Sequence, residues 1–148
     1  MLGGDAGSIR PMNCLEALLL ATQTERSARK GYSMYSRPTE FLSYVLVRGD
    51  SLKVWYYTVD QAGVRALGRL HDPVTADVRA GWAVRSNIHN HNFFPDSARV
   101  LGGVVPSATD VQALRNMRTS IGLTRASITN GFHTIDIGPA DVDRFRGP

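Results

Sequence analysis

The spacing of hydrophobic and polar positions predicts a helix near the start of the chain. From Met12 to Lys30 apolar side chains recur at helical spacing, and basic residues fill the last turn. Gly31 follows, at the position where a helix C-cap is expected. We expect the buried face of this helix to carry four residues, Leu15, Leu18, Leu19 and Thr22.

Three strands are expected between this helix and the middle of the chain. Aromatic and branched residues dominate 40–47, and a second such run covers 51–60. From Trp82 to Phe94 apolar and polar positions alternate, which predicts a strand with two different faces. One face carries His89 and His91, and the opposite face carries Trp82, Val84 and Ile88.

The second half of the chain adds a helix and a hairpin. Apolar residues recur at helical spacing in 107–122, and 124–137 forms two runs around Asn130-Gly131, a strong hairpin signal. Residues 64–78 fit either a helix broken at Pro73 or an irregular excursion, and the role of Ala62–Gly81 is left open. These elements indicate a single compact α/β (α+β) domain over 12–148, with a mixed β-sheet flanked by an N-terminal helix and a central helix. A flexible, glycine-rich arm is expected at 1–11.

Composition and charge narrow the classes of protein that fit. The chain has 148 residues, of which 43% are hydrophobic and 20% charged, as in globular rather than disordered proteins. The net charge is +4, but the arginines are scattered, so no nucleic-acid partner is expected. The sequence shows no apolar run that spans a bilayer and no secretory signal. We therefore expect a cytoplasmic protein without a membrane partner, and we leave signal-less secretion and the oligomeric state open.

The candidate metal ligands are histidine and aspartate rather than cysteine. Cys14 is the single cysteine, so neither an intrachain disulfide nor a cysteine-based zinc cluster can form. We expect it to be a small buried residue of the first helix. His89 and His91 are two residues apart on a predicted strand, so their imidazoles share a face and can converge on one ion. The alternative is a pair of exposed strand histidines.

Asp110 is the candidate for a third ligand. It follows His91 after a loop that can return the chain to the end of the strand. The pattern Ser107-x-x-Asp110 also fits a capping box, with Ser107 as N-cap and Asp110 as the third helical residue. Both interpretations can hold together, because a capping aspartate is fixed in place and a helix N-terminus favours developing negative charge.

Glu40 is the candidate for a general base. A water molecule on a catalytic zinc needs a nearby carboxylate that takes its proton without binding the metal. Glu40 begins an apolar strand, where a charge has little structural reason to lie. The alternative is that Glu40 is simply the polar end of that strand.

Taken together, the segments RPTEFLSYVLVRG, HNH and PSATD resemble, in this order, the JAMM (MPN-plus, JAB-domain) zinc metallopeptidases. That family has a glutamate at the start of an early strand, His-x-His at the end of a later strand, and Ser-x-x-Asp at the start of a helix. The similarity runs from Arg37 to Ile137 and so covers most of the chain. It implies a compact MPN/JAB-like domain.

The resemblance also implies residue roles and a substrate class. One Zn2+ per chain would be bound by His89, His91 and Asp110. Glu40 would activate the water and protonate the leaving amine, and Ser107 would hydrogen-bond the oxyanion. Family members hydrolyse isopeptide or peptide bonds, often after the Gly-Gly tail of ubiquitin or a ubiquitin-like protein. Others process sulfur-carrier precursors or cut peptides in phage-tail and cell-wall settings.

Two departures from the family leave the substrate open. A proline commonly follows the second histidine, whereas Asn92 stands here, and the loop 92–106 is longer than in many members. Such a loop can act as a lid or recognise a partner. A non-catalytic MPN-type binding module is the main alternative to a deubiquitinase-like peptidase, and the complete ligand set argues against it. A metal-dependent phosphoesterase would need more carboxylate ligands.

Overall fold

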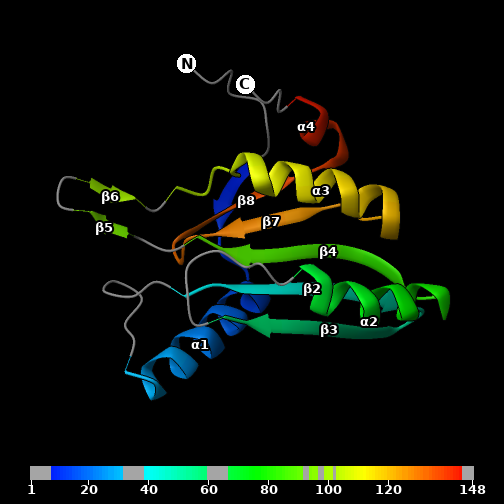
Figure 1. The fold of residues 1–148 in the computed structure, drawn as a ribbon, viewed down its shortest axis with the longest axis horizontal. Coiled ribbons are helices and arrows are strands. Elements are labelled where there is room, and N and C mark those ends of the chain that lie inside the picture. Colours follow the sequence, from blue (N-terminus) through cyan, green and yellow to red (C-terminus); the bar gives the residue numbers. More distant parts are fainter. Residues whose placement is uncertain are drawn as a thin grey trace.

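The computed structural model describes residues 8–31, 39–59, 67–91, 94–96, 99–101 and 103–144. These residues form a six-stranded sheet, a two-stranded hairpin and four helices (Figure 1). The elements in chain order are β1 (Ser8–Pro11), α1 (Cys14–Arg29), β2 (Phe41–Arg48), β3 (Ser51–Thr58), α2 (Leu67–Arg79), β4 (Ala83–Asn90), β5 (Phe94–Asp96), β6 (Arg99–Leu101), α3 (Ala108–Ile121), β7 (Ala126–Thr129), β8 (His133–Ile137) and α4 (Pro139–Arg144). The architecture is mixed α/β, as expected.

A parallel strand pair at the centre of the sheet decides where the candidate ligands meet. The strand order is β1-β8-β7-β4-β2-β3, in which β4 and β7 run parallel and the other neighbours antiparallel. Parallel strands need a crossover connection, and α3 lies in the connection between β4 and β7. α3 therefore starts near the edge of the sheet where β4 ends, which is the usual place for a site in such a unit.

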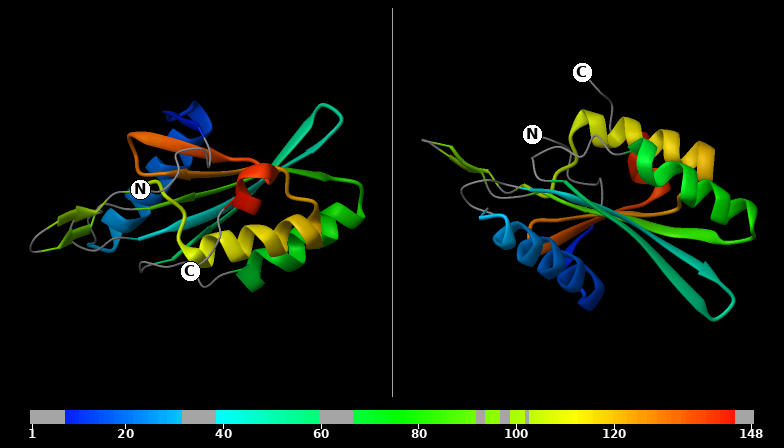
Figure 2. Two further views of the ribbon diagram at one scale, coloured as in Figure 1. Left: turned by 90° about the horizontal axis from the view of Figure 1, so that it is seen from above. Right: turned by 60° about the horizontal axis from the view of Figure 1, so that its bottom comes forward.

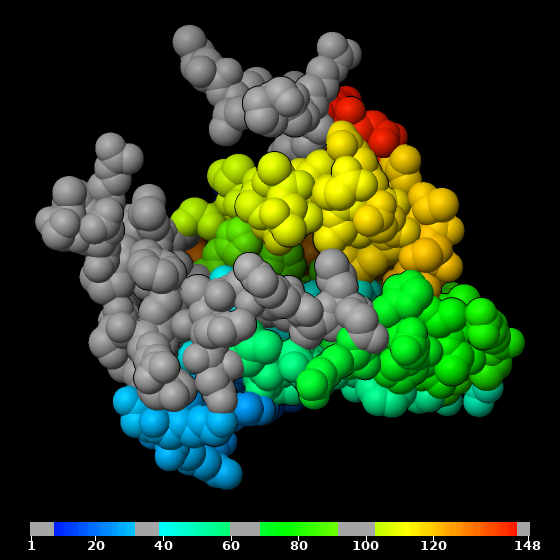
Figure 3. Space-filling view, in the orientation of Figure 1, coloured from blue at the N-terminus to red at the C-terminus, as the bar shows by residue number. Residues whose placement is uncertain are grey.

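Helices cover both faces of the large sheet (Figure 2). α2, α3 and α4 pack on one face, where their apolar side chains join Tyr44 and Leu46 of β2 in the main core cluster. Figure 3 shows α2 and α3 on this face of the molecule. α1 covers the opposite face, where Leu19 packs against Phe41 and Val45. Residues 41–46 are all buried because helices cover β2 on both sides.

The buried stripe of α1 is mainly polar. Its buried residues are Glu16, Leu19, Gln23 and Ser27. The prediction that Leu18 and Thr22 lie on the buried face is therefore wrong, because Leu18 is 63% exposed and Thr22 is also exposed. The buried polar side chains form hydrogen bonds with other residues of the chain. A pattern of hydrophobic and polar positions cannot predict their burial, because it does not show which polar residues have such partners. Cys14, expected to be buried, is exposed.

A β-bulge changes the alternation along β4. The pairing of β2 with β4 skips Arg85, which is the extra residue. Val84 therefore joins the main core cluster, while Ile88 packs on the α1 side, so the expectation that they share a face is wrong. Beyond the bulge the register is regular, and His89 pairs with Leu42 of the main core cluster.

The segment around Pro73, for which the sequence allowed two interpretations, contains the helix α2. Leu67–Arg79 form one helix that includes this proline, and residues 60–66 lie outside the described part of the chain. Pro73 removes one intrahelical hydrogen bond. Leu70 and Val74 are buried in the main core cluster, and this packing stabilises the helix despite the missing bond. Among the described residues, no helix combines the length and the apolar character that crossing a membrane requires.

β8 joins the expected hairpin to the N-terminal segment. It pairs with β7 in the hairpin expected around Asn130-Gly131, where Gly131 takes a φ of 94° that favours glycine. On its other side β8 pairs with β1, so Ser8–Pro11 form an edge strand rather than part of a flexible arm at 1–11. All four residues of β1 have a paired residue on β8. Residues 1–7 lie outside the described residues.

Arg10 on β1 connects the sheet edge to α1 through ion pairs. Its guanidinium binds Asp136 (Nε to Oδ2, 2.6 Å) and Glu16 (Nη2 to Oε1, 2.5 Å). Arg125 and Ser127 also donate hydrogen bonds to Asp136. Burial raises the pKa of Asp136, but these bonds outweigh it and lower the pKa from 3.8 to about 2.

We expect this network to make the protein less stable in acid. Because the pKa of Asp136 is lower in the folded state, its stabilisation is present above about pH 4 and is lost as the pH falls toward 2. The loss should be about 2 kcal/mol of unfolding free energy, measured by urea denaturation at about pH 5 and about pH 2.5. Asp136→Asn should show a smaller acid-dependent loss. Asp72→Asn, at a side chain that is 92% exposed, should behave like the parent; an equal loss in both variants would contradict the expectation.

Candidate metal centre

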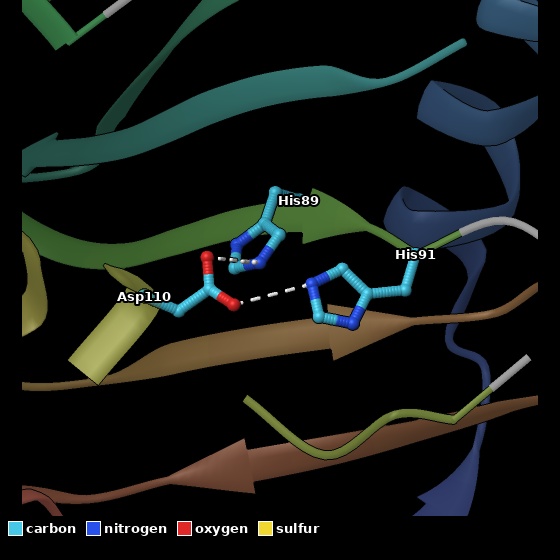
Figure 4. A group of neighbouring side chains, drawn as sticks. All are labelled: His89, His91 and Asp110. Atoms are coloured by element: carbon cyan, nitrogen blue, oxygen red, sulfur yellow. Dashed lines mark ion pairs between the residues drawn. The ribbon is translucent and has the colours of Figure 1, made fainter. Parts of the chain in front are cut away.

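β4 presents the two histidines at its carboxyl end. His89 lies between Leu42 of β2 and Ile128 of β7 and is 8% exposed. His91 follows the strand, and its backbone N–H donates to the carbonyl of Thr129 at 2.9 Å. Because strand residues two apart lie on the same side, both imidazoles project over one face of the sheet (Figure 4). Their ring centroids are 5.1 Å apart.

α3 brings Asp110 to the same face. Ser107 is the N-cap, and its hydroxyl oxygen accepts a hydrogen bond from the backbone N–H of Asp110. In return, Asp110 Oδ2 accepts from the backbone N–H of Ser107 at 2.7 Å and from its hydroxyl at 2.6 Å. The capping box is thus confirmed, and it holds the carboxylate with Oδ1 toward His89 and Oδ2 toward His91 (Figure 4).

The three side chains lie close enough together to hold a metal ion. Asp110 Oδ1 is 3.5 Å from His89 Nε2, and Asp110 Oδ2 is 3.3 Å from His91 Nε2. One donor atom from each residue lies within 4.8 Å of the others. Zinc binds such atoms at about 2.0–2.1 Å, so neighbouring ligands of a tetrahedral ion are about 3.4 Å apart. Direct charge-assisted hydrogen bonds are shorter, about 2.7–2.9 Å. Both distances are longer than such bonds and are compatible with an ion between the ligand atoms.

The ring nitrogens are oriented as a metal site requires. His89 Nε2 is buried and has no hydrogen-bond partner among the described residues. Such an atom costs free energy unless something binds it. His91 Nδ1 lies 3.2 Å from the carbonyl oxygen of Gly103, and in the tautomer whose Nδ1–H donates there, Nε2 keeps its lone pair. Both observations favour a bound cation between the rings and Asp110.

The pKa shifts of His89 and Asp110 favour the protonation states of metal ligands, whereas the shift of His91 favours its protonated form in the absence of a cation. Burial lowers the pKa of His89 to about 4, so this ring is neutral at pH 7. Burial also lowers the pKa of His91, but the hydrogen bond and charge of Asp110 outweigh it and raise the pKa overall. Burial raises the pKa of Asp110, yet His91, His89 and Ser107 outweigh it and bring the pKa well below its usual range. The ionised aspartate and neutral His89 are ready to bind a metal without losing a proton.

Glu40 lies at the same edge of the sheet, directly before β2. The residue is half-buried, and its carbonyl accepts a hydrogen bond from Val59 N–H at 3.0 Å. Since Leu42 pairs with His89, the pleat places Glu40, two residues earlier, on the side of the sheet that carries both histidines. Its charge contributes to the raised pKa of His91. Glu40 is not among the converging ligand residues, as expected for an acid that lies beside the ion.

The connection 92–106 contains features that the sequence did not predict. β5 and β6 form a short antiparallel hairpin within it, which extends away from the large sheet in Figure 1. Asn92 lies outside the described residues. After the hairpin, Gly103 supplies the carbonyl that faces His91. The contact of Gly103 was not predicted, and its signal in the sequence was the Gly102-Gly103 pair.

Asn90, between the two histidines, was also missed. Its buried side-chain amide binds the backbone of residues 39 and 41, on both sides of Glu40. A polar residue at the centre of the His-x-His segment was the available signal.

Three separate segments therefore build the candidate centre. The end of β4 supplies His89 and His91, the start of α3 supplies Asp110, and the residue before β2 supplies Glu40. Ser107, the fifth residue expected at the site, binds Asp110 through its hydroxyl. Comparison of the chain with models of protein families, with curated proteins and with solved structures finds no match.

Proposed function

We propose that the chain is a zinc-dependent metallopeptidase of the JAMM (MPN-plus) type that hydrolyses an isopeptide or peptide bond. The main support is the convergence of His89, His91 and Asp110 from two elements at a spacing suited to zinc. The unpartnered, buried Nε2 of His89 adds to this support. The order of the motifs along the chain favours the MPN/JAB version of the mixed α/β fold.

The proposed ligands leave one position of a tetrahedral site for water or substrate. A bound zinc ion would supply a Lewis acid that polarises the scissile carbonyl and lowers the pKa of a water molecule. Glu40 takes a proton from the attacking water as its oxygen forms a bond to the carbonyl carbon. The same carboxyl group then donates this proton to the amide nitrogen as the C–N bond breaks. One amide and one water become a carboxylic acid and an amine.

Ser107 is the proposed donor to the oxyanion. Its hydroxyl binds Asp110 Oδ2, and this oxygen also accepts from the backbone N–H of Ser107. The backbone bond can therefore hold the cap while the hydroxyl turns toward substrate. The residue is exposed, and it stands at the N-terminus of α3, where the helix dipole adds partial positive charge.

The function is tested by offering the zinc-loaded protein several substrates with scissile bonds of the proposed classes. The set contains ubiquitin-like conjugates, Gly-Gly-extended precursors, and peptides of the phage-tail and cell-wall types. We expect cleavage of at least one substrate class, loss of cleavage with a chelator, and recovery when zinc is returned. Cleavage that persists after complete metal removal would contradict a zinc mechanism. Tight zinc binding without any cleavage would instead favour a non-catalytic binding module.

A further inference from the structure

Asn90 holds the backbone on both sides of the proposed general base. Asn90 is fully buried, and the pleat of β4 directs its side chain away from the face that carries His89 and His91. Asn90 Oδ1 accepts from the backbone N–H of Phe41 at 2.7 Å, and Nδ2 donates to the carbonyl of Thr39 at 3.2 Å. One side-chain amide therefore binds both peptide groups that flank Glu40.

α1 supports the same segment from the other side. Gln23 Nε2 donates to the hydroxyl of Thr39 at 2.7 Å, and the hydroxyls of Ser27 and Thr39 lie 2.6 Å apart. Tyr56 donates its hydroxyl to Gln23 Oε1 at 3.3 Å. These contacts supply partners for the buried Gln23 and Ser27 of α1, and they hold the Thr39 side chain directly before Glu40. Among the residues that bind the segment before β2, Asn90 differs from Gln23 and Ser27 because it lies on the strand that carries the histidines.

We propose that Asn90 is a positioning residue that fixes the carboxylate of Glu40 relative to the metal centre. The inference rests on the proposed function. Its basis is the direct bridge from the residue between His89 and His91 to the peptide groups of Glu40. Because both hydrogen bonds are buried, loss of the amide leaves a backbone N–H and a carbonyl without these partners, and the segment shifts to find others.

Asn90→Ala should lower kcat about 10- to 100-fold, because displacing a catalytic group by about 1 Å has an effect of this size. KM and the affinity for zinc should stay within about twofold of the parent, since no proposed ligand is changed. If this variant does not fold, Asn90→Ser is used, because a serine hydroxyl is too short to bridge both peptide groups.

Asn87→Ala is the matched control. Asn87 is also a buried asparagine of β4, 1% exposed, and its Nδ2 donates to a β2 carbonyl, that of Ser43, at 3.1 Å. Its removal deletes a similar inter-strand bond without touching the peptide groups of Glu40. The melting temperature should fall in both variants, whereas the large loss of kcat should be confined to Asn90→Ala.

Two readouts do not depend on a substrate. Hydrogen exchange of the Phe41 amide should become about tenfold faster or more in Asn90→Ala but not in Asn87→Ala, because Asn90 protects this N–H. With Co2+ in place of zinc, the visible absorption reports the surroundings of the ion. Asn90→Ala should reproduce the spectral change caused by Glu40→Gln, and the double variant should match Glu40→Gln alone.

The outcomes separate this inference from the proposed function. If the parent binds zinc but cleaves no substrate, the peptidase proposal fails, and the cobalt spectra still decide whether Asn90 positions Glu40. Parental kcat in Asn90→Ala overturns the inference, as does a cobalt spectrum that Asn90→Ala leaves unchanged. A loss of kcat that is equal in Asn87→Ala also overturns it, because the effect would then be general destabilisation of β4.

Discussion

Replacing Glu40 with glutamine is expected to leave zinc bound and to reduce turnover about a thousandfold or more. Glutamine has nearly the same shape but cannot take a proton from water or return one to the amine. General acid–base catalysis raises reaction rates about 10²- to 10⁴-fold. Glu40 is proposed both to take the proton from water and to donate it to the leaving amine. The affinity for zinc should change little, because Glu40 is not one of the converging ligands.

The measurement compares kcat and KM of Glu40→Gln and the parent at equal zinc content. Glu25→Gln is the matched control, because this glutamate of α1 has a 65% exposed side chain and pairs with Arg29 on the surface. It should cleave at the parental rate. A parental rate in Glu40→Gln would show that another group moves the proton, while loss of zinc from this variant would make Glu40 a ligand.

Asp110→Asn is expected to weaken zinc binding about a thousandfold, equivalent to about 4 kcal/mol. The substitution keeps an oxygen that can cap α3 but removes the negative charge that faces both histidines. Two neutral imidazoles then remain as the proposed protein ligands. Activity should fall with zinc occupancy, and added zinc should raise the melting temperature of the parent but not that of Asp110→Asn.

Asp141→Asn separates the metal effect from the capping effect. Asp141 lies in the first turn of α4 and accepts from the backbone N–H of Gly138, three residues earlier, at 2.8 Å. This repeats the bond between Asp110 and Ser107 without the histidines. Isothermal titration with zinc should therefore give parental affinity for Asp141→Asn. Equal affinities in Asp110→Asn and the parent would remove Asp110 from the site.

The local parts of the site could be predicted from the sequence because they depend on short spacings. The interval between His89 and His91 places both rings on one side of any strand. The interval between Ser107 and Asp110 specifies a helix cap, and the structure forms that cap. Their meeting depends on the parallel pairing of β4 with β7, a long-range arrangement that a single pattern of hydrophobic residues does not specify.

The features that the sequence did not predict depend on partners distant along the chain. The polar residues of α1 are buried because Thr39 and Thr134 supply hydrogen bonds, so their burial cannot be read from α1 itself. The bulge at Arg85 depends on how β2 pairs with β4. The amide of Asn90 and the carbonyl of Gly103 acquire their contacts only when the fold is complete. The proposed MPN/JAB description remains an expectation from the motif order.

The short separation of the two histidines has a consequence for the denatured chain. Unfolding carries Asp110 away from the imidazoles, but one intervening residue keeps His89 and His91 as neighbours in any conformation. A denatured molecule therefore retains a weak two-nitrogen chelate, and an ion that also binds the unfolded chain stabilises the native state less than its affinity suggests. Thermal shifts with zinc should thus give a weaker apparent affinity than direct titration of the folded protein.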